Sequence, residues 1–271
     1  MNYLSTMHSH TTYCDGDNPP AEMAEAAYKL GFVSFGFSGH SHLPYKAGYD
    51  MKMEKEKLYR KEIQALKEQY NGKMEILLGL ELDADSSKPD FKYDYLISSV
   101  HQLHINGNWY AVDHCKADFD KCISAFGGID NMIKAFYSAT ITAALRDDID
   151  IVGHIDLIGK FNEDNVYFNP NDEQYLNAVF DAIDAILEKR PDIVFEINTG
   201  AISRGYRTTP YPDFPVLKYL AKKGARLMLN SDTHAADTLD YAYDIALDYL
   251  KKAGIKTLYR LRKFGFEEIA I

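Results

Sequence analysis

Residues 74–81 read MEILLGLE, an apolar run that ends in a glutamate. The run is about as long as a β-strand, and it is too short for a helix of usual size. Glu81 therefore follows directly on a buried strand, where its charge requires a partner or a metal ion.

Six further runs share this design: each is short, rich in apolar, β-branched or aromatic residues, and ends in a polar side chain. They are residues 2–8 ending at His8, 32–40 at His40, 93–101 at His101, 149–154 at His154, 192–198 at Asn198 and 225–232 at Asp232. Together with residues 74–81 they predict seven strands.

Helix-like stretches lie between these runs. Residues 19–31 begin with proline and end with glycine, the usual punctuation of a helix. Residues 51–72 carry Leu58, Ile63 and Leu66 as apolar positions among charged ones. Four more helices are predicted at 128–148, 171–190, 213–224 and 239–254. Alternating strands and helices indicate parallel βαβ units, either in a barrel or in a doubly wound sheet.

The segment of residues 104–113, HINGNWYAVD, differs from the rest. Its Asn-Gly pair suggests a hairpin-like turn. We find no repeat, no low-complexity tract and no linker that would divide the chain, so we expect a single domain over residues 1–271.

Composition excludes several classes of protein. The chain has 271 residues, 46% of them hydrophobic, and a net charge of −10, which argues against a protein that neutralises many nucleic-acid phosphates. The chain has three cysteines and no CxxC pair, which argues against a disulfide framework and against a thiolate zinc site. We find neither a signal-peptide pattern nor an apolar run near 18 residues, so we expect a cytoplasmic protein without a membrane partner.

The chemical side chains recur at the carboxyl ends of successive predicted strands. In a β/α barrel these ends form one face, where residues distant in sequence converge. His8 and His10 have strand spacing and can face one cation, and His40 and His42 repeat this spacing. Imidazole and carboxylate together suit Zn²⁺, Mn²⁺ or Fe²⁺. A single such histidine is more often structural, but six strand ends with His, Asp or Glu are much harder to explain independently.

Some polar residues fall outside this pattern. We assign His104 and His114 to the surface or to a structural role. Cys14 is interpreted as a small packing residue, and Asp83 and Asp85 are assigned to a solvated loop or a helix cap.

An ordered set of motifs carries a resemblance to a known family. HSHTTYCDG, GHSH, GLELD, SVH, GHIDLI and NSDTH follow one another over nearly the full length. The chain thereby resembles the PHP family, named for polymerase and histidinol phosphatase. Its size, GHSHLP and INTGAISRG are most similar to the stand-alone histidinol-phosphate phosphatase branch. The resemblance implies an α/β fold, a distorted TIM-like (β/α)7 barrel, with two to three divalent metal ions (Zn, Mn or Fe) at its carboxyl-terminal face.

The resemblance also implies three sets of metal ligands. They are His8, His10, Glu81 and Asp232 for the first ion; Glu81, His101 and His154 for the second; and Asp15, His40 and His234 for the third. The Glu81 carboxylate would bridge the first two ions. Asp17 is close enough to substitute for Asp15.

The expected mechanism follows from the charge of these ions. A metal-bridging hydroxide would attack phosphorus, and the cations would neutralise the phosphate oxygens. Arg204 is the first choice for a phosphate clamp, with a solvated loop arginine as the alternative, and Arg207 and Lys160 are weaker choices. His42 would contact phosphate or protonate the leaving oxygen. Catalytic roles are thus assigned to His42, Glu81 and Asp232.

The resemblance implies hydrolysis of L-histidinol phosphate to L-histidinol and phosphate, a step of histidine biosynthesis. The expected partner is a small phosphomonoester, with no nucleic acid, and the sequence leaves the oligomeric state open. The alternatives are a PHP-type phosphoesterase for another small phosphate or a nucleotide, a nuclease, and a non-catalytic PHP-like module. A deacetylase or amidohydrolase-like barrel is barely excluded by the metal motifs alone.

Overall fold

The fold is built on a seven-stranded parallel sheet. The computed structural model of the chain describes residues 3–45 and 47–271. The strands follow one another in the sheet in chain order: β1 (Ser5–Thr6), β2 (Ser34–Phe37), β3 (Glu75–Asp83), β4 (Tyr95–Ser99), β7 (Ile151–Val152), β8 (Val194–Asn198) and β9 (Arg226–Asn230). Each overlaps one of the seven predicted runs. Asn2, the first residue of the first run, lies outside the described residues.

The two outer strands of this sheet, β1 and β9, approach each other. A parallel bridge joins Ser9 and Thr233 just beyond their ends. The backbone N–H of Met7 also donates to Asn230 Oδ1 at 2.7 Å. The sheet is thus a nearly closed barrel, which confirms the TIM-like (β/α)7 fold and excludes the doubly wound sheet.

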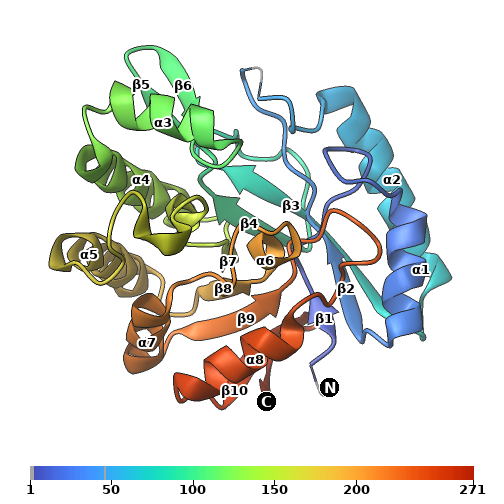
Figure 1. Cartoon of the computed structure of the whole chain (residues 1–271). Helices are drawn as coiled ribbons and strands as arrows, with labels where there is room; N and C mark the ends of the chain where they lie inside the picture. The colour runs from blue at the N-terminus through green and yellow to red at the C-terminus, as the bar shows by residue number, and fades with distance from the viewer. Residues whose placement is uncertain (1–2, 46) are drawn as a thin grey trace.

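Helices surround the barrel (Figure 1). Six of them lie within predicted ranges: α1 (Pro20–Leu30), α2 (Met53–Gln69), α4 (Ile129–Ala144), α5 (Glu173–Lys189), α7 (Phe214–Lys223) and α8 (Tyr243–Lys252). The sequence did not predict α3 (Lys116–Ala125), the short α6 (Gly200–Ser203), or the 3₁₀ turns η1 (Leu157–Gly159) and η2 (Glu163–Asn165).

The buried face of α2 differs from the prediction at one position. Ile63 and Leu66 are buried as expected, but Leu58 is 57% exposed. Tyr59 takes its place in the core, where its hydroxyl donates to the Gly79 carbonyl oxygen at 2.9 Å. Positions 59, 63 and 66 are three or four residues apart and lie on one helical face. Position 58 is adjacent to 59 in sequence, so its side chain points away from that face.

The barrel interior is filled by side chains rather than left open. Tyr95 lies at its centre and donates to the carbonyl oxygens of Met7 and Phe37 at 2.5 and 3.0 Å. Gly79 makes room for this ring, because a Cβ there would lie 2.5 Å from Tyr95 Cζ. The packed interior leaves the carboxyl ends of the strands as the place for a site.

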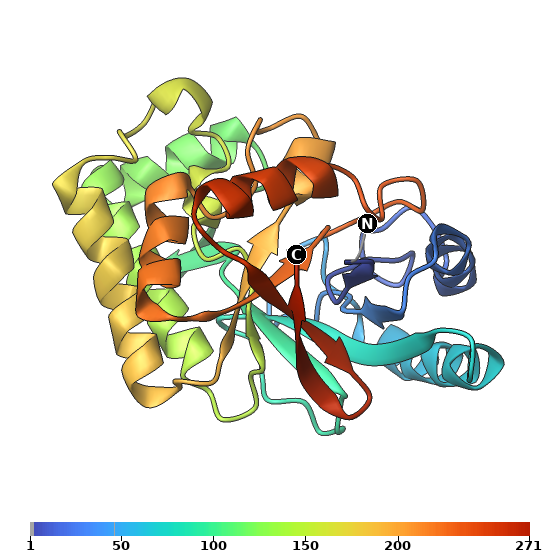
Figure 2. The ribbon, with the colours of Figure 1, turned by 90° about the horizontal axis from the view of Figure 1, so that it is seen from below.

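Two antiparallel hairpins extend the barrel. The first joins β5 (Gln102–Ile105) and β6 (Asn108–Ala111) through Asn106 and Gly107, which both have positive φ, so the predicted Asn-Gly turn is confirmed. The second, β10 (Thr257–Arg262) with β11 (Gly265–Ala270), was not predicted. It crosses the side of the barrel away from the view of Figure 1 (Figure 2). The side chain of Leu261 belongs to the interior cluster that contains Tyr95.

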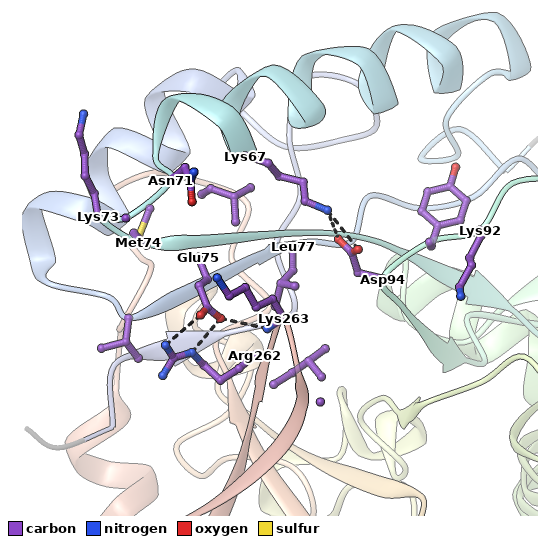
Figure 3. A pocket seen from close by; sticks show the side chains of 16 residues that line it. Lys67, Asn71, Lys73, Met74, Glu75, Leu77, Lys92, Asp94, Arg262 and Lys263 are labelled. Atoms are coloured by element: carbon purple, nitrogen blue, oxygen red, sulfur yellow. Dashed lines mark hydrogen bonds and ion pairs between the residues drawn. The ribbon is translucent and has the colours of Figure 1, made fainter.

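A hollow of about 660 Å³ lies where the tip of this second hairpin meets the beginning of β3 (Figure 3). Lys67 pairs there with Asp94 at 2.8 Å, and Arg262 pairs with Glu75 at 2.8 Å. No histidine lines it. Its charges are paired across loops at the amino end of β3, remote from Glu81 at the other end of the strand.

In the described ranges, no helix has the length and apolar character needed to cross a bilayer.

Candidate metal centre

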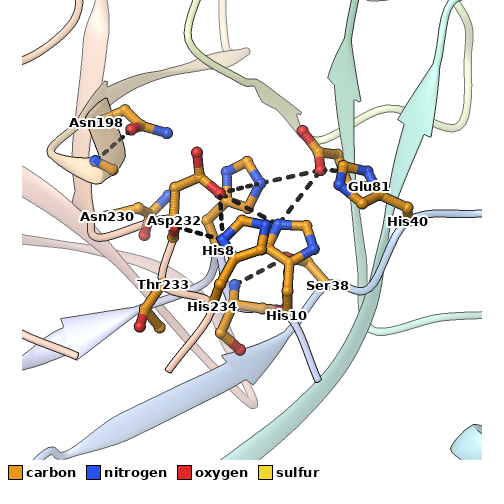
Figure 4. Close-up of polar contacts among 12 residues, drawn as sticks. His8, His10, Ser38, His40, Glu81, Asn198, Asn230, Asp232, Thr233 and His234 are labelled. Carbon is orange, nitrogen blue, oxygen red and sulfur yellow. Dashed lines mark hydrogen bonds and ion pairs between the residues drawn. The ribbon is translucent and has the colours of Figure 1, made fainter. Parts of the chain in front are cut away.

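The carboxyl ends of the strands bring the nine predicted metal ligands together (Figure 4 shows several of them). In each of four overlapping groups the donor atoms lie within 4.8 Å of one another. The groups are His8, His10 and Asp232; His8, Glu81 and His154; His40, Glu81 and His101; and His10, Asp15, His40 and His234. The convergence follows from the parallel sheet, which places the end of every strand on one face.

The first predicted set has the spacing of a tetrahedral cage. Glu81 Oε2 lies 3.2 Å from His8 Nε2 and 3.5 Å from His10 Nε2. Asp232 Oδ1 lies 3.5 and 3.2 Å from the same two nitrogens. Four ligands about 2.0–2.1 Å from a tetrahedral ion would be about 3.3–3.4 Å apart. The observed spacing therefore fits a divalent ion.

Unpaired polar atoms point to the same conclusion. His8 Nε2, His10 Nε2 and Glu81 Oε2 are buried, and among the described residues none of them has a hydrogen-bond partner in good geometry, although His40 Nδ1 lies 2.9 Å from Glu81 Oε2. Buried polar atoms are nearly always paired, and a missing partner at such a cluster indicates an ion that these atoms would bind.

The second predicted set shares Glu81 with the first. Glu81 Oε1 lies 3.3 Å from His101 Nε2 and 3.1 Å from His154 Nε2. The two oxygens of one carboxylate thus face two different groups of nitrogens. This is the arrangement that a carboxylate bridging two ions requires.

The third predicted set is more open. Asp15 Oδ1 lies 3.7 Å from His40 Nε2, and Asp15 Oδ2 lies 3.4 Å from His234 Nε2. Asp15 belongs to this donor group, whereas Asp17 does not. His40 also approaches Glu81 Oε2 through Nδ1, at 2.9 Å. The third set is therefore contiguous with the first two.

The buried acids of the centre keep their negative charge. Glu81 is only 1% exposed, and burial by itself raises its pKa, but His8, His40 and His101 hold that pKa well below the usual value. Burial likewise acts to raise the pKa of Asp232, but His8, Arg204 and the neighbouring histidines together hold that pKa well below its usual value. The centre is consequently a pocket of carboxylate charge that attracts cations.

Two further carboxylates stand behind the histidines, and the sequence analysis missed both roles. Glu196 Oε1 lies 2.7 Å from His8 Nδ1, and Asp83 Oδ2 lies 3.2 Å from His101 Nδ1. The assignment of Asp83 to a solvated loop or a helix cap is wrong, because Asp83 is buried and is the last residue of β3. A glutamate inside the apolar run VFEIN was the signal that could have identified Glu196.

A cavity of about 190 Å³ opens onto the centre. Arg204 and Lys160 line it, together with members of all three ligand sets. Arg204 Nη2 donates to Asp232 Oδ2 at 3.1 Å, and Arg204 Nη1 lies 3.0 Å from His234 Nδ1. Lys160 Nζ donates to the backbone oxygen of Asp113 at 2.6 Å and pairs with the carboxylate of the same residue, which also lines the cavity, at 3.2 Å. Both cations can thus approach an anion in this cavity.

The two other predicted phosphate contacts lie elsewhere. Arg207 does not line the cavity, since its guanidinium is buried, pairs with Asp213 and stacks over Tyr211 with 4.8 Å to the ring centroid. His42 does not line it either, and its Nδ1 lies 3.2 Å from Asp50 Oδ2. Arg207 follows the INTG motif and His42 follows the GH motif, which is why both were predicted near the centre. Their positions in the sequence could not predict which way their side chains face.

The chain is similar to known proteins along most of its length. The PHP domain matches residues 6–200. The chain is 27% identical to the probable histidinol-phosphatase of Deinococcus radiodurans, over 97% of this chain and 99% of that one. It is 29% identical to the histidinol-phosphatase of Bacillus subtilis, over 89% of this chain and 97% of that one.

A solved structure shares the fold. The histidinol phosphate phosphatase of Lactococcus lactis, in complex with zinc, L-histidinol and phosphate, superposes with a TM-score of 0.71, at 20% identity over 97% of this chain and 98% of that one. More than half of the chain matches the PHP domain, in the segment that contains most of the metal centre. The chain therefore belongs to the PHP domain family.

Proposed function

We propose that this chain is a metal-dependent phosphomonoesterase that hydrolyses L-histidinol phosphate to L-histidinol and phosphate. One observation carries the proposal: a single buried carboxylate, Glu81, turns its two oxygens toward two separate groups of histidines. This is the donor arrangement of a multinuclear hydrolytic site. The match to histidinol phosphatases along nearly the whole chain supports the substrate.

The ligands proposed from the sequence overlap the donor groups of the site, in which Glu81 is grouped with His8 and His154 and also with His40 and His101. His8, His10, Glu81 and Asp232 would hold the first ion, and Glu81, His101 and His154 the second. Asp15, His40 and His234 would hold the third. When bound, such ions lower the pKa of water and neutralise charge on a phosphate group. The absence of cysteine from these sets leaves Zn²⁺, Mn²⁺ and Fe²⁺ as the fitting ions.

The side chains of this protein would bind and orient the phosphate. Arg204 has a planar fork that can contact two phosphate oxygens, and its hydrogen bond to Asp232 fixes that fork at the edge of the centre. Lys160 adds a second positive charge at the cavity wall. Asp232 would therefore act both as a ligand and as an anchor for the clamp.

His42 and Arg207 have less direct roles in this proposal. Arg207 is bound to Asp213 and would support the loop that carries Arg204. His42 has a side chain that is 38% exposed, and its role in protonating the leaving oxygen stays a prediction. A histidine with access to solvent can exchange protons with water, which suits it to such a role.

The size of the cavity favours a small ester over a nucleic acid. About 190 Å³ accommodates a small phosphomonoester, and the acidic chain has no basic stripe that would follow a phosphate backbone. A different small phosphate remains the second candidate. We further propose that residues 1–271 act as one phosphatase domain in the cytoplasm, as the sequence predicts.

Metal analysis and turnover test this function together. The purified protein is dialysed against zinc or manganese, its metal content is measured, and phosphate release is followed for a panel of phosphomonoesters that includes L-histidinol phosphate. We expect at least two ions per chain and the highest kcat/KM for L-histidinol phosphate. Faster turnover of another ester would overturn the substrate, and full loading without phosphatase activity would overturn the proposed function.

A further inference from the structure

Glu196 is a buried carboxylate in β8 that belongs to none of the four donor groups. Glu196 is only 1% exposed, so the hydrogen bonds that its carboxylate accepts come from the protein. An unpaired charge at this depth would cost several kcal/mol, and the surroundings of Glu196 are accordingly saturated with donors.

Both oxygens of Glu196 are occupied. Oε1 accepts from Asn230 Nδ2 at 2.9 Å and lies 2.7 Å from His8 Nδ1. Oε2 accepts from the backbone N–H of His154 at 2.8 Å and from Asn198 Nδ2 at 2.9 Å. These donors come from β8 and β9 and from segments that follow β1 and β7. One carboxylate therefore joins four strands of the barrel beneath the metal centre.

The two asparagines are themselves held in one orientation. Asn230 Oδ1 accepts from the backbone N–H of Met7 at 2.7 Å, and Asn198 Oδ1 accepts from that of Gly200 at 2.8 Å. Because backbone N–H groups can only donate, the amide nitrogens of both side chains must face Glu196. The carboxylate is consequently fixed on both sides and cannot rotate away from His8.

We infer that Glu196 is the positioning residue that keeps the proton of His8 on Nδ1, so that the lone pair of Nε2 faces Glu81 and Asp232. An ionised carboxylate can only accept, so His8 Nδ1 must donate to it. His8 Nε2, at 3.2 Å from Glu81 Oε2 and without a hydrogen-bond partner, is then free to bind an ion. The inference rests on the proposed metal-dependent function.

Glutamine at this position separates this role from a packing role. Glu196→Gln keeps the size of the side chain but replaces one acceptor by an NH₂ group. Whichever way the amide turns, its NH₂ faces donors, either His8 and Asn230 or the backbone of His154 and Asn198. Turned toward His8, it forces the ring to accept at Nδ1 and to carry its proton on Nε2, where an ion would otherwise bind.

The chain offers a matched control for Glu196→Gln. Asp94 is a more exposed carboxylate, with a side chain that is 32% exposed, and it likewise accepts from a backbone N–H, that of Leu78, at 2.7 Å. It lies beside the hollow at the amino end of β3, away from the metal centre. Asp94→Asn therefore makes the same carboxylate-to-amide change at another carboxylate that binds a backbone N–H, without touching a metal ligand.

Zinc affinity provides the first readout. Apparent zinc affinity is measured by competition with a chelator for the wild type, Glu196→Gln and Asp94→Asn, with folding of each checked by circular dichroism. We expect Glu196→Gln to bind the first ion, the one that His8 would hold, about 10- to 100-fold less tightly. This is the usual effect of removing the carboxylate behind a ligating histidine. We expect no such change in Asp94→Asn. Wild-type affinity in a folded Glu196→Gln would overturn the inference.

The tautomer of His8 provides a second readout that does not depend on the folding of Glu196→Gln. Nitrogen NMR of the zinc-loaded wild type, with the signal assigned through His8→Gln, identifies which ring nitrogen carries the proton. We expect the proton on Nδ1, and a proton on Nε2 would overturn the inference even if Glu196→Gln failed to fold. A wild type that binds zinc with this tautomer but releases no phosphate would refute the proposed function and leave the positioning role intact.

Discussion

Neutralising Glu81 is the perturbation to which the metal centre should be most sensitive. Glu81 lies within 3.5 Å of five imidazole nitrogens, which belong to His8, His10 and His40 on one oxygen and to His101 and His154 on the other. Glu81→Gln retains the shape and one coordinating oxygen but loses the charge and the second acceptor. Two ion sites are therefore weakened by one substitution.

The magnitude follows from the charge that is lost. Two unit charges 4 Å apart interact by about 4 kcal/mol at an effective dielectric constant of 20, and a ligand oxygen lies closer to its ion than that. If the substitution forfeits only about half of this at each site, each ion binds about 30-fold more weakly, since 1.4 kcal/mol is a tenfold change. Over two ions the combined loss of affinity is about 10³-fold. At a free zinc concentration that just saturates the wild type, the fully loaded form and the turnover that depends on it should fall by a similar factor.

The assay compares metal content and phosphate release at equal free zinc. Glu188→Gln is the matched control, because its side chain is 73% exposed on α5 and makes the same change of charge far from the centre. We expect Glu188→Gln to be fully loaded and active, and Glu81→Gln to lose ions on dialysis and to lose activity. A fully loaded Glu81→Gln with more than a tenth of wild-type turnover would refute the bridging role of this carboxylate.

Three other predictions concern the clamp, the barrel interior and one ion pair. Arg204→Lys should lower kcat/KM by about 10- to 100-fold and weaken inhibition by inorganic phosphate, because lysine keeps the charge but loses the planar fork; steady-state kinetics measures both. Gly79→Ala should destabilise the fold by about 1–3 kcal/mol in urea unfolding, since the new Cβ would lie 2.5 Å from Tyr95; an unchanged midpoint would contradict the packing. The side chain of Arg262 lowers the pKa of Glu75, so their pair should stabilise the fold above the ordinary glutamate pKa, by at most about 1 kcal/mol at this half-exposed site, and the contribution should vanish as pH falls through the lowered value. The difference in unfolding free energy between wild type and Arg262→Gln should therefore shrink from pH 6 to pH 3, and a constant difference would speak against it.

Local patterns were enough to locate most of the fold. Seven apolar runs and six amphipathic stretches correspond to seven strands and six helices of the structure, because the burial of a strand or a helix face is recorded in its own residues. The Asn-Gly turn at Asn106 and Gly107 was likewise predicted, since its backbone conformation depends on those two residues. The hairpin of β10 and β11 was missed, because its packed side chains, Leu258, Leu261 and Phe266, are meaningful only against the barrel that they cover.

The sequence by itself determined which residue types end the strands, and therefore that a cluster of imidazoles and carboxylates would form on one face of a β/α fold. Only the tertiary structure decided how those side chains pair. It turned Arg204 toward Asp232 and Arg207 toward Asp213, although the two arginines are neighbours in one loop. It also placed Asp83 and Glu196 behind histidines from other strands. The succession of strands and helices along the chain and the apolar face of each element are recorded in local sequence, whereas the direction of a side chain depends on partners that are distant in sequence and that become neighbours only when the barrel closes.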